Sequence, residues 1–146
     1  MITYKLMHEY HFQDMLDIFK LHHKEAGLPF LLDDYALTRY LEEYVTAPNK
    51  VAFVALNEEE EAIGCIAGVF TPSIYDGKTI VAWQTHWFVK EEWRGKGAGM
   101  QLYKLFAEYA REKGAKFHIV QVRKFSSSFA KRHDFKFLEQ FLVKEI

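Results

Sequence analysis

The sequence predicts a single mixed α/β domain over residues 1–146, and three observations support that fold class. First, this length fits one domain, and 49% apolar residues are enough for a hydrophobic core without disulfides or metals. Second, segments that alternate like strands are interspersed with segments of helical period. Third, a strand, a glycine-rich turn, a helix and a strand follow one another from Thr79 to Val122, which predicts a parallel strand pair.

The N-terminal third predicts one strand and two helices. Ile2 to Met7 has a short strand pattern, and a helical pattern follows from Phe12 to the break at Gly27. Asp33 or Asp34 can cap the second helix, which ends before Pro48.

Three strand patterns fill the middle of the chain: Val51–Leu56, Ile63–Phe70 and Thr79–Val89. The acidic run from Glu58 to Glu61 between the first two indicates a solvated hairpin turn rather than a binding site. The one cysteine, Cys65, lies in the second pattern, so no intrachain disulfide can form. We expect a buried structural thiol and a reducing compartment.

The C-terminal part predicts an amphipathic helix, a strand, a short helix and a last extended strand. The buried face of the long helix is expected at Leu102, Leu105, Phe106 and Tyr109, with Gly114 as its C-cap. The later elements are expected at Lys116–Val122, Ser126–Arg132 and Phe137–Lys144.

The charge balance excludes some partners. Nineteen Lys and Arg against twenty Asp and Glu give a net charge of -1, so neither nucleic acid nor an anionic membrane is expected to bind. No apolar stretch approaches the ~20 residues of a membrane span, and the first residues lack a signal-peptide core. We therefore expect a soluble, cytoplasmic protein.

The segment Arg94 to Gly99 carries the clearest chemical signal. Its glycines lie at the start of the predicted long helix, where unsatisfied N–H groups and the helix dipole attract anions. Arg94 and Lys96 add positive charge. The Walker and dinucleotide fingerprints do not fit this glycine spacing, and a purely structural tight turn is the alternative.

These residues resemble the signature of the GNAT superfamily of acyl-CoA-dependent N-acetyltransferases, Arg/Gln-x-x-Gly-x-Gly/Ala. Arg94, Gly97 and Gly99 match it. The family's wider pattern, a strand-ending Val, an acidic turn, an aromatic residue and Arg-Gly-Lys-Gly, is met from Val89 to Gly97. The order of elements also resembles the GNAT fold, a central mixed sheet flanked by helices.

The resemblance implies transfer of an acetyl group from acetyl-CoA to a primary amine, by direct attack in a ternary complex and without a metal. The acceptor would be a small-molecule or peptide amine, and the resemblance leaves room for a homodimer. Carried over position by position, the pantetheine-binding residues would be Phe88, Val89 and Lys90, and the pyrophosphate-binding residues Arg94, Gly95, Lys96, Gly97, Ala98 and Gly99.

Two departures from the family concern its catalytic residues. The usual Tyr general acid of the last short helix is replaced by Ala130. Ser127 or Ser128 could donate the proton instead, or the thiolate could leave unaided, because a thiol pKa of about 8.5 makes it a tolerable leaving group. The family's general-base positions correspond to Trp83 and Thr85, which do not titrate usefully.

His86 is the neighbouring candidate base, but regular alternation would turn it to the opposite face of the strand unless a bulge shifts the parity. A packed or surface histidine is the alternative.

Other functions remain open from the sequence. A non-catalytic acyl-CoA-binding module on the same fold is the main alternative to an enzyme, because the usual acid and base are missing. An acetyltransferase acting on aminoacyl-tRNA would favour a basic surface, which the net charge of -1 does not provide. The histidines of the N-terminal region lack the further ligand spacing of a metal site.

Overall fold

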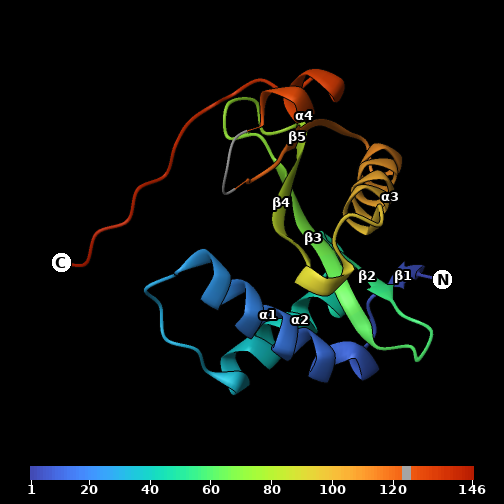
Figure 1. Ribbon diagram of the computed structural model, residues 1–146. Helices are drawn as coiled ribbons and strands as arrows, with labels where there is room; N and C mark the ends of the chain where they lie inside the picture. The colour runs from blue at the N-terminus through green and yellow to red at the C-terminus, as the bar shows by residue number, and fades with distance from the viewer. Residues whose placement is uncertain (123–125) are drawn as a thin grey trace.

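The computed structural model of the protein describes residues 1–122 and 126–146. In chain order the elements are β1 (Thr3–Leu6), the 3-10 turn η1 (Glu9–His11), α1 (Phe12–Ala26), α2 (Asp34–Thr46), β2 (Lys50–Leu56), β3 (Ala62–Pro72), β4 (Ile80–Val89), the 3-10 turn η2 (Glu91–Trp93), α3 (Ala98–Glu112), β5 (Ala115–Ile119) and α4 (Ser127–Arg132). Helices α1 and α2 pack on one face of a central sheet, and α3 packs on the other (Figure 1).

The sheet has five strands in the order β1-β2-β3-β4-β5. Neighbours from β1 to β4 pair antiparallel, whereas β4 and β5 pair parallel, with Ile80 opposite Ala115. The predicted mixed α/β fold with a parallel strand–helix–strand unit is therefore confirmed. Because helices cover both faces, β2 and β3 are buried almost throughout, which explains their continuous apolar sequences.

The two N-terminal helices form as the sequence predicts. In α1, Met15 and Ile18 are among the buried residues, and Gly27 ends the helix in the left-handed conformation at φ 63°. In α2, the Asp33 side chain accepts a hydrogen bond from the Ala36 N–H at 2.7 Å, so Asp33 is the N-cap.

Helix α3 is rotated slightly from the predicted face. Leu102 and Phe106 are buried as expected, but Tyr103 and Ala110 complete the buried stripe, while Leu105 and Tyr109 are only partly buried. The ring of Phe106 approaches the sheet where Gly68 has no side chain. A Cβ built on Gly68 would lie 2.3 Å from Phe106 Cζ, so this glycine makes the close packing of helix and sheet possible.

The prediction of a last strand at Phe137–Lys144 is wrong. Residues 135–146 form no helix or strand, and the C-terminal segment runs away from the body of the molecule (Figure 1). Phe141 and Leu142 are exposed. An apolar extended segment becomes a strand only when a neighbouring backbone pairs with it, and the sheet formed by the described residues consists of β1 to β5 without this segment. Strand β5 also ends earlier than predicted, at Ile119.

Candidate active site

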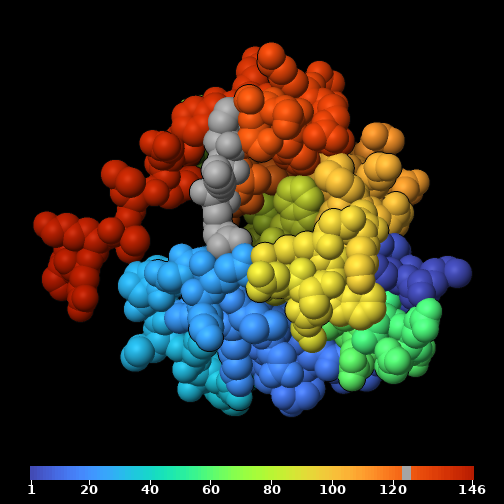
Figure 2. Space-filling model, in the orientation of Figure 1, coloured from blue at the N-terminus to red at the C-terminus, as the bar shows by residue number. Residues whose placement is uncertain are grey.

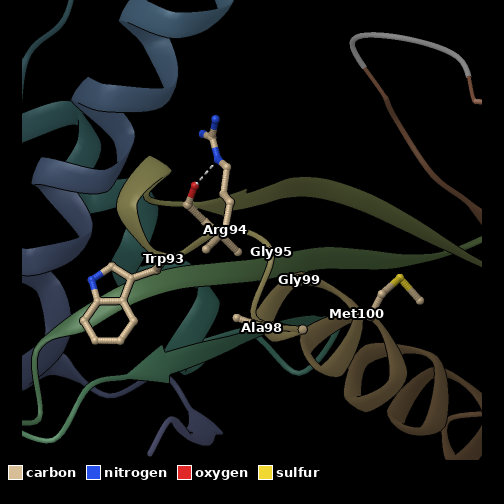
Figure 3. A pocket seen from close by; sticks show the side chains of 8 residues that line it. Trp93, Arg94, Gly95, Ala98, Gly99 and Met100 are labelled. Carbon is tan, nitrogen blue, oxygen red and sulfur yellow. Dashed lines mark hydrogen bonds between the residues drawn. The ribbon is translucent and has the colours of Figure 1, made fainter.

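The glycine loop lies between η2 and the first turn of α3 (Figure 3), as the sequence predicts. It borders a cavity of about 350 Å³ lined by Val89, Trp93, Arg94, Gly95, Gly97, Ala98, Gly99 and Met100. Gly97, the N-cap of α3, has no side chain to accept from the first-turn N–H groups, and the first turn contains no acidic residue. The positive end of the helix therefore faces the cavity without an internal counter-charge.

The three glycines of the loop serve different needs. Gly95 and Gly97 have φ angles of 77° and 84°, which residues with a side chain rarely adopt, so the backbone itself requires them. Gly99 is helical, and a Cβ there would make only ordinary contacts, at 3.7 Å from Trp87 Nε1 and 3.8 Å from Val89 Cγ2. The fold does not require glycine at this position, and glycine even weakens a helix, so the reason for Gly99 lies outside the fold.

The Arg94 side chain extends away from the start of α3 (Figure 3). Its Nε donates a hydrogen bond to the Val89 carbonyl at 2.8 Å, and its Nη2 donates to Glu25 Oε2 on α1 at 2.6 Å. The guanidinium also lies 5.2 Å from the centre of the Phe88 ring. The hydrogen bond to Glu25 raises the pKa of Arg94 further. The other cation of the loop, Lys96, lies over the Trp93 ring at 4.6 Å.

Trp87 ties the first turn of α3 to β4, because its indole N–H donates to the Gly99 carbonyl at 3.0 Å. By residue type alone, Trp87 is expected in the core, with an aromatic-lined acceptor cleft as the alternative. The ring does pack on Tyr103 and Phe129, but the indole nitrogen gives the residue a second role at the loop. A signal was present, since Trp87 lies two residues before Val89 and therefore on the same face of the strand.

A β-bulge interrupts β4 where the candidate base lies. Ala67 pairs with His86 and the adjacent Gly68 with Gln84, which leaves Thr85 as the extra residue. As a result both Thr85 and His86 face α1 and α2: the Thr85 hydroxyl is 2.7 Å from the Tyr44 hydroxyl, and the His86 ring is 4.6 Å from the Phe19 ring. The bulge that His86 needs in order to reach this face is present.

Among residues 1–122 and 126–146, β4 is paired on only one side beyond the bulge. β3 accompanies it as far as Val89, but β5 pairs only with the stretch from Ile80 to Trp83. At the fork, Gln84 Oε1 accepts a hydrogen bond from the Gln121 N–H at 2.8 Å. Figure 2 shows atoms in the yellow-green of β4 at the bottom of a hollow between blue α1, the yellow loop and orange-red α4. Within the described residues, no strand completes this edge.

His86 is a neutral imidazole at physiological pH. Burial, together with a smaller effect of the nearby His22 ring, lowers its pKa to about 4. Its Nδ1 is buried and has no hydrogen-bond partner among residues 1–122 and 126–146. Neutral imidazole is the form that accepts a proton, but such a low pKa makes it a weak base.

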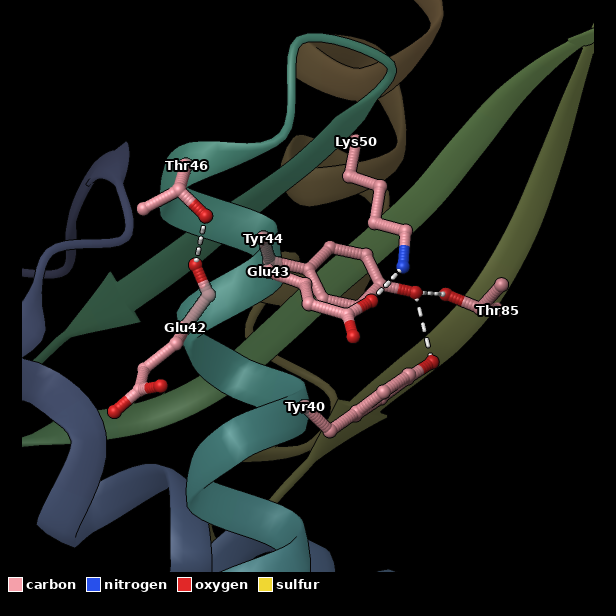
Figure 4. A network of polar contacts seen from close by, with 7 residues as sticks. All are labelled: Tyr40, Glu42, Glu43, Tyr44, Thr46, Lys50 and Thr85. Atoms are coloured by element: carbon pink, nitrogen blue, oxygen red, sulfur yellow. Dashed lines mark hydrogen bonds and ion pairs between the residues drawn. The ribbon is translucent and has the colours of Figure 1, made fainter.

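A polar network lies beside His86 on the same face of the sheet (Figure 4). The hydroxyls of Tyr40 and Tyr44 are 2.8 Å apart, and that of Tyr44 also reaches Thr85. The Lys50 ammonium pairs with Glu43 and lies over both tyrosine rings. Burial raises the pKa of Tyr44, so the phenol stays protonated. Helical spacing places Tyr40 and Tyr44 on one stripe of α2 with Leu37 and Leu41, which predicts a shared face but not this network.

The candidate acids lie elsewhere. Ser127 and Ser128 are exposed residues in the first turn of α4, where the Ser126 hydroxyl accepts from the Phe129 N–H. Ala130, at the position of the expected Tyr, is buried with 7% of its surface exposed. The structure thus offers the exposed hydroxyls of Ser127 and Ser128 as proton donors, while Ala130 supplies no phenol at the position of the expected Tyr.

Cys65 is completely buried in the core, and burial raises its pKa to about 12, so the expectation of a structural thiol is confirmed. In the part of the chain that the structure describes, no three His, Cys, Asp or Glu side chains are grouped as around a metal ion. No helix among those residues is long and apolar enough to cross a membrane.

The mixed sheet, with a glycine loop joining β4 to the helix α3, defines the acetyltransferase class of folds. The sequence model of the acetyltransferase (GNAT) family matches residues 13–135, and the chain belongs to this family.

Solved structures support the same fold. An acetyltransferase from Trypanosoma brucei has a TM-score of 0.80 at 18% identity, covering 100% of both chains. A predicted acetyltransferase with acetyl-CoA from Clostridium acetobutylicum has a TM-score of 0.81 at 19% identity, covering 99% of this chain and 96% of its own. An aminoglycoside acetyltransferase from an uncultured soil metagenomic sample, in complex with sisomicin, reaches 0.72 at 19% identity, covering 99% and 95%. No curated protein matches the sequence.

Proposed function

We propose that the protein transfers an acetyl group from acetyl-CoA to a primary amine of an acceptor molecule. The observation that carries the proposal is the edge of β4 beyond Trp83, which no strand of the described residues pairs, next to the start of α3, which no side chain caps. Peptide groups on an unpaired strand edge can hydrogen-bond the amides of a pantetheine arm, and helix N-terminal amides can bind its pyrophosphate. The site therefore fits an acyl-CoA.

The residues divide between these two tasks. In the proposal, Phe88, Val89 and Lys90 present their backbone to the pantetheine arm. The loop from Arg94 to Gly99 takes the pyrophosphate, with Gly97 and Gly99 leaving its amides accessible. An N–H group near the end of β4 would polarise the thioester carbonyl and stabilise the charge that develops on its oxygen.

The reaction would proceed by direct attack. The neutral amine nitrogen bonds to the thioester carbon, the C–S bond breaks, and the thiolate of CoA leaves. The ammonium proton passes to water or to His86, whose pKa of about 4 makes it a weaker base than an ordinary histidine. Ser127, Ser128 or water would then protonate the thiolate.

The acceptor is proposed to be a small-molecule or peptide amine. Structures of similar fold include an aminoglycoside acetyltransferase in complex with sisomicin, which supports a small-molecule acceptor. A non-catalytic acyl-CoA-binding module is the second candidate, because Ala130 removes the phenol that would protonate the thiolate and the buried His86 is a weak base.

The test combines binding and turnover. We expect CoA to bind and to raise the melting temperature, since a ligand specific for the native state stabilises it. Release of the CoA thiol should be followed with acetyl-CoA and a panel of polyamines, amino acids, aminoglycosides and peptides. Binding without turnover of any amine would favour the binding module, and no binding at millimolar CoA would refute both functions.

The proton donor can be tested separately once an acceptor is known. A residue that donates a proton in the transition state contributes a factor of about 10² to 10⁴ in rate. Ser127→Ala or Ser128→Ala should lower kcat by such a factor if that serine is the acid. Full activity of both variants across the pH range would leave unaided departure of the thiolate, and Ala130→Tyr would show whether a phenol accelerates the reaction.

A further inference from the structure

We propose that Glu25 is a positioning residue for the glycine loop, the donor loop from Arg94 to Gly99, and that it acts by holding the Arg94 side chain against α1. The inference rests on the proposed binding of acyl-CoA and adds a residue outside the glycine loop. In this arrangement the backbone of the loop, rather than the Arg94 guanidinium, meets the pyrophosphate.

Arg94 is held by three groups from two elements. Glu25 comes from the last turn of α1, the Val89 carbonyl from the end of β4, and the Phe88 ring from the same strand. The Arg94 and Glu25 side chains are 38% and 32% exposed, so this ion pair is partly shielded from water. A charge-assisted hydrogen bond of 2.6 Å in such surroundings is stronger than a pair on the open surface.

The ion pair links two parts of the chain that are distant in sequence. Glu25 and Arg94 are 69 positions apart, and their contact joins α1 to the donor loop. Arg94 directly precedes Gly95, whose φ angle is 77°. Holding the Arg94 side chain therefore fixes where the glycine turn begins, before any ligand binds. A loop that is already ordered in the free protein loses less conformational entropy when the ligand binds.

The opposite account makes Arg94 a direct phosphate ligand. For that, Arg94 would have to exchange the Glu25 carboxylate for phosphate, and Glu25 would compete with CoA. The two accounts predict opposite signs for the same variant, Glu25→Gln. Competition requires CoA to bind more tightly to the variant, whereas positioning requires weaker binding.

The experiment measures the dissociation constants of CoA and of pantetheine for wild type, Glu25→Gln, Arg94→Gln and the double variant. We expect Glu25→Gln to weaken CoA roughly three- to tenfold, the effect of ordering one long side chain on binding. Arg94→Gln should have a similar effect, and the double variant should be no worse than either single variant, because the two side chains act as one unit.

Pantetheine separates positioning from general destabilisation. It lacks the pyrophosphate, so its binding should be unchanged in all variants, whereas a damaged fold would weaken both ligands. Asp17→Asn, which removes one exposed negative charge from the same helix, is the matched control and should bind CoA as wild type does.

Each outcome decides. Tighter or unchanged CoA binding in Glu25→Gln overturns the inference while leaving the proposed function intact, as does an equal loss for pantetheine. A CoA loss in Arg94→Gln that far exceeds the loss in Glu25→Gln assigns Arg94 to the phosphate instead. Wild-type protein that binds no CoA refutes the proposed function itself.

Discussion

Replacing Gly97 or Gly99 by alanine separates what the backbone needs from what a ligand needs. Gly97 has φ 84°, and an alanine in a left-handed conformation costs about 1–2 kcal/mol, partly offset by about 0.4–1 kcal/mol from a less flexible unfolded chain. We therefore expect Gly97→Ala to lose about 1 kcal/mol of stability, a drop in Tm of about 2–4 °C for a chain of this size.

Gly99→Ala should behave differently. Its site is helical and a Cβ would meet nothing closer than 3.7 Å, so the free energy of unfolding should be unchanged or rise by up to about 1 kcal/mol. Gly99→Val places a larger side chain at the wall of the cavity. The variant should fold, but CoA binding should weaken roughly 5- to 150-fold for each hydrogen bond from a backbone amide, worth about 1–3 kcal/mol, that is lost.

Urea unfolding and calorimetric titration with CoA measure both effects, with Gly95→Ala as a control, since its φ of 77° is equally restrictive. Equal stability of Gly97→Ala and Gly99→Ala would show that backbone conformation is not the constraint at Gly97. Wild-type affinity for CoA in Gly99→Val would show that the loop is a structural turn only.

Three further results are expected. Burial lowers the pKa of His118 to about 4, so the unfolded chain takes up a proton at a higher pH than the folded chain does. The free energy of unfolding should therefore fall by up to about 1.4 kcal/mol per pH unit as the pH drops from 6.5 towards 4. His118→Phe should flatten that slope in urea titrations at pH 7 and 5. An unchanged slope would contradict this. Cys65 should resist a thiol reagent in the native protein and react after unfolding, because burial raises its pKa to about 12; rapid native labelling would mean that the core opens readily. Gly68→Ala should destabilise the protein by about 1–3 kcal/mol through contact with Phe106, and Phe106→Leu should recover part of the loss; a Gly68→Ala variant of normal stability would rule out tight packing there.

The features that the sequence predicted are those with local causes. The Asp33 cap and the loop from Arg94 to Gly99 depend on residue types at short spacing. The face of β4 on which His86 lies could be predicted only on the condition that a bulge is present, because a bulge depends on the register between two strands. The contact between Glu25 and Arg94 spans 69 positions and leaves no periodic trace in the sequence.

The errors have a common physical origin. The strand predicted at Phe137–Lys144 has suitable residue types, but a strand also requires a paired backbone, which residue type does not specify. In α3, Phe106 lies against the sheet at Gly68, and the buried stripe includes Tyr103 and Ala110 where Leu105 and Tyr109 were expected. In both cases, tertiary contacts decided what periodicity left open.

The half-paired stretch of β4 also bears on how the protein avoids self-association. Unpaired strand edges are templates on which other chains can add, and proteins usually shield them with charge, proline or a covering element. Here atoms in the colour of β4 lie at the bottom of a hollow between α1, the glycine loop and α4 (Figure 2). A second protein would have to bring a strand with its flanking side chains into that hollow, whereas a slender chain-like molecule needs far less room. The depth of the hollow therefore keeps these peptide groups available for hydrogen bonding to a ligand without promoting association with other protein chains.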